Sequence, residues 1–265
     1  MDYIVFTDYW IYNNNMIIIK PSFNNNLDLI NFNSNIVSLV FTNYYIIDNA
    51  IKNIHNNNCY YELRINSYFN QTVDNLPFHI QNLIFGEEFN QTVDNLPINM
   101  QNLTFGNNFN QTVDNLPSSL LNLIFGYNFN QPIDNLPIYI QKLTFDIDFN
   151  QNIDSLPHMI QNLTFDWYFN QSVDNLPLKI INLTFGCCFN QFVDNLPSSI
   201  LNLTFGQNFN HQLDNLPNSL LQLILPKYYD KEFMIPTNLK KIYCSFNYKY
   251  LDKLKSKEIK IILQN

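Results

Sequence analysis

Apolar and polar positions along this chain follow a pattern that returns every twenty residues. From Phe69 to Pro217 eight nearly identical copies follow one another without insertion or deletion. The apolar positions of one copy are Phe89, Val93, Leu96, Met100, Leu103 and Phe105. A fixed period of this length is typical of a solenoid, in which each turn of chain stacks on its neighbours.

Within each copy the residues corresponding to 102–105 alternate polar and apolar. This alternation predicts a short strand with Leu103 and Phe105 pointing inward and Asn102 and Thr104 outward. Stacked turns would place these strands side by side in a parallel sheet, ~4.8 Å apart. We therefore predict a right-handed solenoid with a parallel sheet on one face, loops or 3₁₀ segments on the other, and few or no long helices. We call the set of equivalent positions in successive copies a column. The inward columns begin with Phe69, Val73, Leu76, Ile80, Leu83 and Phe85.

Glycine and proline each occupy a fixed position in the repeat. All five glycines lie in the column directly after the strand, and two full copies carry Asp146 and Asp166 there instead. Because Gly and Asp tolerate a positive φ, this column predicts a left-handed turn position. The proline column, represented by Pro97, has no N–H to donate, so it is expected outside the sheet ladder on the far side.

Degenerate copies of the repeat flank the regular array, so the chain has three segments. Residues 1–68 predict degenerate repeats and a cap, 69–225 hold the eight regular repeats, and 226–265 predict basic degenerate repeats and a second cap. In the flanks we expect strands at 17–19, 39–41 and 63–65, and a closing strand at 259–261.

Charge and cysteine content narrow the possible partners. The net charge is −8, yet residues 226–265 hold nine Lys and four acidic residues, so the rest of the chain is strongly acidic. An acidic body argues against nucleic acid as a partner. The basic tail is expected to be a solvated end cap, with a contact patch as the alternative.

No basic leader or membrane-length apolar run occurs, and the four cysteines show no metal or redox spacing, so we expect a cytoplasmic monomer that binds no membrane.

Two strings of the repeat resemble a known family. Phe129-Asn-Gln-Pro-Ile133 and Leu116-Pro-Ser-Ser-Leu120-Leu-Asn-Leu123-Ile-Phe-Gly126 are similar to FNIP repeats, a divergent leucine-rich-repeat family of social amoebae and of giant viruses that infect amoebae. The resemblance covers residues 69–225 and implies a leucine-rich-repeat-like fold without an assigned enzymatic activity. The amoebal repeat is usually two residues longer, and only Pro132 keeps the proline after Phe-Asn-Gln. Some relatives carry an N-terminal F-box, but residues 1–68 show no helical F-box pattern.

Two polar columns are filled in every copy. The carboxylate column could form a metal ladder, as in calcium-binding β-solenoids, or could cap the N–H groups of its own bend. We favour the cap, because calcium sites of that kind need more glycines and more than one carboxylate per turn. Repulsion within this column predicts raised pKa values for some members. The asparagine column predicts a ladder that satisfies backbone groups inside the stack. The columns are Asp74, Asp94, Asp114, Asp134, Asp154, Asp174, Asp194 and Asp214, and Asn70, Asn90, Asn110, Asn130, Asn150, Asn170, Asn190 and Asn210.

No set of residues predicts catalysis or a cofactor. The four histidines fall in different columns or in the flank, and no nucleophile–base–orienter set can be assembled, so we expect a protein that is not an enzyme. The pair Cys187-Cys188 could hold a reactive thiol or a vicinal disulfide, and a tolerated surface pair is favoured over both.

The candidate site comes from the positions at which the copies differ. The two residues after the glycine column change from copy to copy, so they can encode a partner, and Trp and Tyr are common binding hot spots. Drift at a loop tip is the alternative. We predict Trp167 and Tyr168 on a rim, flanked by Tyr127, Ile147 and Cys187, beside a polar sheet face made by Asn162, Thr164, Asn182 and Thr184.

These observations favour a non-enzymatic protein–protein interaction scaffold in the cytoplasm, which would be the host cytoplasm for a viral protein. Its partner is expected to be a protein with a neutral or basic surface. One alternative is a substrate-receptor subunit of a ubiquitin ligase that recruits through residues 1–68. A more distant alternative is a metal-stabilised structural solenoid.

Overall fold

The computed structural model describes residues 4–5, 9–12, 16–19 and 38–41, and residues 68–264 except 75 and 77. The chain folds into two compact units, Met1–Gln131 and Pro132–Asn265.

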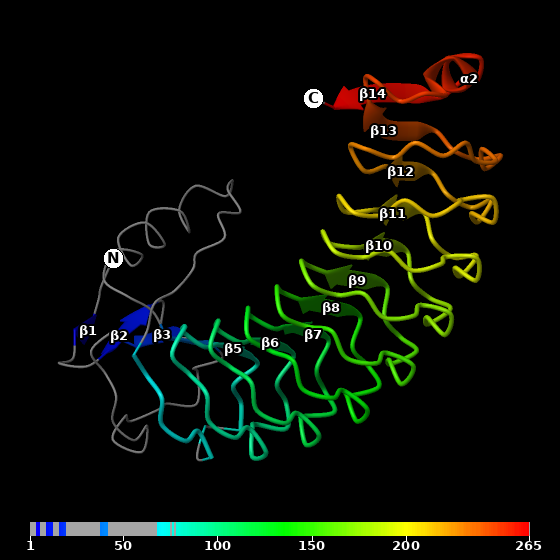
Figure 1. The fold of residues 1–265 in the computed structure, drawn as a ribbon. Helices are drawn as coiled ribbons and strands as arrows, with labels where there is room; N and C mark the ends of the chain where they lie inside the picture. Colours follow the sequence, from blue (N-terminus) through cyan, green and yellow to red (C-terminus); the bar gives the residue numbers. More distant parts are fainter. Residues whose placement is uncertain are drawn as a thin grey trace. The chain divides into compact units, whose positions relative to one another are not determined.

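The unit Pro132–Asn265 is a parallel β-solenoid. Its strands are β8 (Lys142–Phe145), β9 (Asn162–Phe165), β10 (Asn182–Thr184), β11 (Asn202–Thr204), β12 (Gln222–Ile224), β13 (Lys241–Ser245) and β14 (Lys260–Gln264). Each strand pairs in parallel with the next, and equivalent residues of successive repeats face one another, such as Leu163, Leu183 and Leu203. Figure 1 shows these strands side by side, with the short helix α2 (Leu251–Lys255), which connects β13 to β14, next to β14. The predicted solenoid and closing strand are confirmed here.

The unit Met1–Gln131 has the same parallel core. Here β3 (Met16–Ile19), β4 (Ser38–Phe41), β5 (Asn82–Ile84), β6 (Asn102–Thr104) and β7 (Asn122–Ile124) pair in parallel. The strands expected at 17–19 and 39–41 are therefore confirmed, whereas the one expected at 63–65 lies outside the described residues.

The first two strands were not predicted. β1 (Ile4–Val5) and β2 (Tyr9–Tyr12) precede the first expected strand and form an antiparallel meander with β3. The connections between these strands are only three residues long. A parallel crossover needs about a dozen residues or more, so connections this short can only join antiparallel strands.

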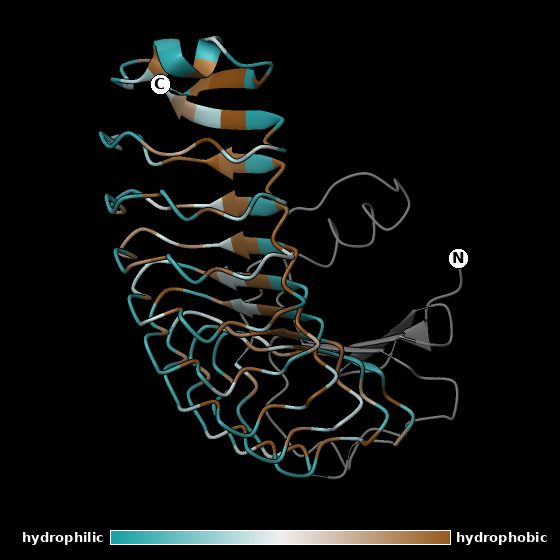
Figure 2. Ribbon diagram, turned by 90° about the vertical axis from the view of Figure 1, so that its right-hand side faces the viewer, coloured by the Kyte–Doolittle hydropathy of each residue, from teal (hydrophilic) through white to brown (hydrophobic). Residues whose placement is uncertain are grey.

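The core consists of the six predicted columns. Their described members are buried, and apolar and polar colours alternate along the strands in Figure 2. Two phenylalanine columns stack inside each turn: the ring centroids of Phe165 and Phe169 are 3.8 Å apart, and Phe165 lies 6.1 Å from Phe185 of the next turn. The prolines begin tight turns outside the sheet, as expected, closed by bonds such as Leu220 N–H to the Pro217 carbonyl at 3.1 Å. Apolar side chains of successive turns therefore stack on one another in the core of each unit.

The asparagine column forms the predicted ladder. Side-chain Oδ1 atoms of this column accept the backbone N–H of the asparagine one turn later, as in Asn110 N to Asn90 Oδ1 at 2.9 Å and Asn190 N to Asn170 Oδ1 at 2.8 Å. The same oxygen of Asn90 also accepts a bond from Gln111 Nε2 at 3.0 Å. One side-chain oxygen thus satisfies two donors of the following turn, where the backbone of the loop has no strand partner.

The glycine column has a different cause from the one predicted. None of Gly106, Gly126, Gly186 and Gly206 has a φ in the left-handed region; a Cβ added to Gly206 would lie 1.9 Å from the carbonyl oxygen of Gly186. Close approach to the preceding turn, and not a left-handed turn, therefore requires glycine. Where Asp166 occupies this column, β9 is one residue longer and the Asp166 N–H donates to the Phe145 carbonyl at 3.2 Å.

The Gly206→Ala substitution should lower the free energy of unfolding by about 1–3 kcal/mol, because the added methyl group meets backbone and not a flexible side chain. Urea denaturation followed by circular dichroism measures the change. Asp166→Ala, in the same column at a turn that already accommodates a Cβ, is the matched control and should stay within about 0.5 kcal/mol. Equal effects of the two substitutions would contradict the close-approach explanation.

Candidate binding rim

In the unit Pro132–Asn265 the variable pairs form one continuous edge. We call residues 147–148, 167–168, 187–188 and 207–208 the rim. Backbone hydrogen bonds join its turns: Tyr168 N to the Ile147 carbonyl at 2.9 Å, Cys188 N to the Trp167 carbonyl at 2.8 Å, and Asn208 N to the Cys187 carbonyl at 2.9 Å. The rim therefore has a fixed backbone even though its side chains vary, and Ile147, Trp167 and Cys187 lie on consecutive turns.

The two aromatic side chains of the rim are open to solvent. Trp167 is 48% exposed and Tyr168 is 51% exposed, whereas Ile147 and Cys187 are half-buried beside them. Both aromatics follow the end of β9 within three residues. Their backbone is hydrogen-bonded to the turns before and after; we call each of these backbone hydrogen bonds between rim residues of successive turns a rung. Because the rungs hold the loop in place, little of its conformational freedom would be lost on binding.

Tyr127 belongs to the other compact unit, where it is half-buried in the equivalent loop. The candidate site within one unit therefore consists of residues from Pro132–Asn265.

The predicted polar sheet face lies on β9 and β10. Asn162 pairs with Asn182 and Thr164 with Thr184, and all four side chains are half-buried. The Asn182 amide donates to Asn162 Oδ1 at 2.6 Å, and Asn202 donates to Asn182 at 2.6 Å. The asparagines thus use much of their hydrogen-bonding capacity on one another, which leaves the threonine hydroxyls as the groups of this face that can readily bind a partner.

The adjacent thiols of the rim are free. Neither Cys187 nor Cys188 forms a disulfide, so a vicinal disulfide is not present. Burial, and then the neighbouring Cys187 thiolate, raises the pKa of Cys188. A raised pKa lowers the thiolate fraction, and this argues against a reactive nucleophile at Cys188.

Side chains of the aspartate column accept hydrogen bonds that link neighbouring turns. Asn115 Nδ2 donates to Asp94 Oδ1 at 3.1 Å in one unit, and Asn175 Nδ2 donates to Asp154 Oδ1 at 3.0 Å in the other. The side-chain hydrogen bond from Asn175, and then that from Asn152, lowers the pKa of Asp154. The shift at Asp154 is opposite to the raised pKa predicted for some members of the column, because an amide donor from the next turn stabilises the charged carboxylate.

No group of three or more His, Cys, Asp or Glu residues in the described part of the chain could hold a metal ion. Among the histidines, His211 Nε2 lies 2.9 Å from the Asn190 carbonyl, and His79 Nε2 is buried without a partner. His55 lies outside the described residues. In the same described part, no helix has the length and apolar character needed to cross a membrane.

A second variable pair was missed by the sequence analysis. It follows the proline column and includes large apolar side chains that are exposed: Ile138, Tyr139 and Leu178 in one unit, and Phe78 and Ile98 in the other. The rim column also continues into the degenerate turns, with Lys227-Tyr228 and Phe246-Asn247. A comparison of every variable position, and not only of the pair after glycine, would have found the pair after proline and the rim positions of the degenerate turns.

Comparisons with known proteins agree with this architecture. The family model described as FNIP Repeat matches residues 89–128, 112–148, 149–188 and 189–228, more than half of the chain. CroV588, a circular LRR protein from a giant virus, is 31% identical, with a TM-score of 0.61 over 91% of this chain and 45% of its own. An internalin (InlF) from Listeria monocytogenes is 14% identical, with a TM-score of 0.48 over 95% of this chain and 87% of its own. The chain thus spans less than half the length of CroV588. No curated protein matches.

Proposed function

Because the chain belongs to the FNIP-repeat family, we propose that it is a non-enzymatic scaffold that binds a partner protein through the rim of the unit Pro132–Asn265. The observation that carries this proposal is the exposure of Trp167 and Tyr168 on a backbone that is hydrogen-bonded to both neighbouring turns. Large aromatics with little freedom to lose are the usual anchors of protein interfaces.

The surroundings of the two aromatics suit such an anchor. The half-buried Ile147 and Cys187 border Trp167, and the hydroxyls of Thr164 and Thr184 can donate and accept hydrogen bonds at the neighbouring strand face. An apolar centre with an adaptable polar surround is the common arrangement of an interface. The acidic character of the chain outside residues 226–265 favours a neutral or basic partner surface at this site. The free thiols of Cys187, Cys188 and Cys244 are compatible with the cytoplasm, the compartment that we propose.

The alternatives receive no specific support. The described residues of 1–68 are strands, whereas an F-box is helical, so no observation favours recruitment of a ubiquitin ligase through this segment. The aspartate carboxylates that a metal ladder would need accept hydrogen bonds from asparagine side chains.

The Trp167→Ala substitution should weaken binding of the partner by about 2 kcal/mol without changing stability. The partner is first identified by affinity capture and mass spectrometry, and its dissociation constant is then measured by titration calorimetry. Tyr139→Ala removes an aromatic of similar exposure from a different column of the same unit, and it should leave the affinity within about 0.5 kcal/mol. A partner that binds Trp167→Ala as tightly as the unmodified chain would refute the rim as the site.

A further inference from the structure

The hydrogen-bond ladder of the rim ends at Asn208. Among the residues that the structure describes, no backbone hydrogen bond joins Tyr228 to Gln207 or Asn247 to Lys227. The Asn247 N–H instead donates to Ser245 Oγ at 3.2 Å. The last of these turns is also one residue shorter, because Lys241 pairs with Gln222. The rungs that hold the preceding turns together are therefore missing here.

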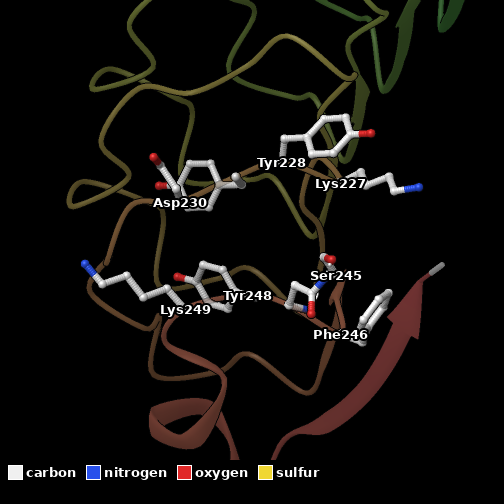
Figure 3. A pocket seen from close by; sticks show the side chains of 9 residues that line it. Lys227, Tyr228, Asp230, Ser245, Phe246, Tyr248 and Lys249 are labelled. Atoms are coloured by element: carbon white, nitrogen blue, oxygen red, sulfur yellow. Dashed lines mark hydrogen bonds between the residues drawn. The ribbon is translucent and has the colours of Figure 1, made fainter.

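A cavity of about 460 Å³ opens between the two turns that lack the rung. We call it the C-terminal groove; its lining includes Lys227, Tyr228, Asp230, Ser245, Phe246 and Lys249. Figure 3 shows Lys227, Tyr228 and Phe246 at one end and Asp230 and Lys249 at the other, with the two lysine side chains pointing in opposite directions. The groove is thus a channel between two turns with a cation at each end.

Both lysines are available to an anionic ligand. Within the described part of the chain, neither Lys227 nor Lys249 forms an ion pair; each lies over a tyrosine ring instead. The carboxylate of Asp230, at the Lys249 end, is 3.4 Å from the ammonium group of Lys231. With nine lysines and four acidic residues in the segment 226–265, the surroundings of the groove are also positive. Positive charge without an internal partner favours an acidic ligand.

Apolar surface lies beside this charge. Tyr228 is 73% exposed and Phe246 is 53% exposed, and both line the Lys227 end of the groove. A simple inorganic anion would leave these rings unused. A ligand that combines carboxylates with an apolar side chain would use both features.

We propose that the C-terminal groove binds an extended acidic peptide segment of a partner protein. An apolar side chain of the segment packs against Tyr228 and Phe246, and its carboxylates face Lys227 and Lys249. The peptide backbone supplies N–H and C=O groups where the rung between the turns is missing, as in other extended-peptide complexes. This inference goes beyond the function proposed above, because it uses none of the residues around Trp167 and would stand if Trp167 contacted nothing.

Three dye-labelled eight-residue peptides test the proposal by fluorescence anisotropy with the full chain. The first has Glu and Asp around a central Leu-Tyr pair, the second replaces that pair with Gly-Ser, and the third replaces the acids with Lys. We expect the first to bind at least about tenfold more tightly than either of the others, since only it satisfies both the cationic and the apolar parts of the groove. Equal binding of the first two peptides, or preference for the basic one, would overturn the assignment.

Variants then locate the site. The double substitution Lys227→Glu and Lys249→Glu should weaken binding of the first peptide at least about tenfold, whereas Lys257→Glu with Lys260→Glu, the same charge change outside the groove, should stay within about threefold. Equal loss of binding in the two double variants would place the peptide elsewhere. Trp167→Ala should leave peptide binding unchanged, which separates this test from that of the proposed function.

Other polyanions provide the last comparison. A single-stranded oligonucleotide and phosphatidylserine vesicles carry negative charge without the acidic-apolar pattern. Either one binding the chain as tightly as the first peptide, and losing affinity in the Lys227 and Lys249 double variant, would show a general polyanion site and refute the peptide assignment.

Discussion

Replacing Phe165 with alanine should lower the free energy of unfolding by about 3–5 kcal/mol. The ring is 1% exposed and stacks on Phe169 at 3.8 Å, on Phe145 at 5.5 Å and on Phe185 at 6.1 Å. Its removal therefore leaves a cavity bordered on several sides by rigid rings, which cannot collapse without disturbing the neighbouring turns. Urea denaturation followed by circular dichroism measures the effect.

Phe192→Ala is the matched control for this substitution. Phe192 lies in the same unit and loses the same atoms, but it is 65% exposed and contacts mainly the ring of His211. Its replacement should change the free energy of unfolding by no more than about 0.5 kcal/mol. A loss of less than about 1 kcal/mol for Phe165→Ala would show that the phenylalanine stack is not the principal source of stability.

The periodic part of the fold could be predicted because every turn repeats the same arrangement of buried and exposed side chains. A column that is apolar in eight copies, such as the one that contains Phe165, has to be buried in each of them, and the alternation from Asn162 to Phe165 fixes the inward face of the strand. The antiparallel strands β1 and β2 occur only once, so no column supports them. The glycine column also misled the prediction, because residue identity alone does not separate a positive φ from a close approach such as that of Gly206 to Gly186.

The site could be predicted only in part for a related reason. The exposure of Trp167 could be predicted because the residue type at its position varies freely between copies. The hydrogen bond between the Asn182 and Asn162 side chains could not, because it depends on side-chain orientation. The C-terminal groove depends on one hydroxyl, that of Ser245, and on a turn that is one residue shorter. Such details are not periodic, and they determine where the surface of the repeat becomes irregular.

The Asn90→Ala substitution should lower the free energy of unfolding by about 2–3 kcal/mol, although it removes little apolar surface. Asn90 Oδ1 accepts the Asn110 N–H at 2.9 Å and the Gln111 Nε2–H at 3.0 Å, and both donors are partly buried. Without this oxygen the Asn110 N–H loses its partner in the preceding turn, and the Gln111 amide keeps only its longer bond to the Asn90 carbonyl at 3.3 Å. An unmet donor in a protein interior costs more than the bond itself contributes.

The Asn90→Asp substitution tests this explanation, because aspartate keeps an oxygen in the position of Oδ1. Since the two accepted bonds can form with a carboxylate, Asn90→Asp should cost less than about 1 kcal/mol, and amide hydrogen exchange should show Asn110 N–H protected in Asn90→Asp but not in Asn90→Ala. If the two variants were equally destabilised, with Asn110 equally protected in both, the acceptor role of the asparagine column would be wrong, and packing of its side chain against the neighbouring turn would have to explain the loss.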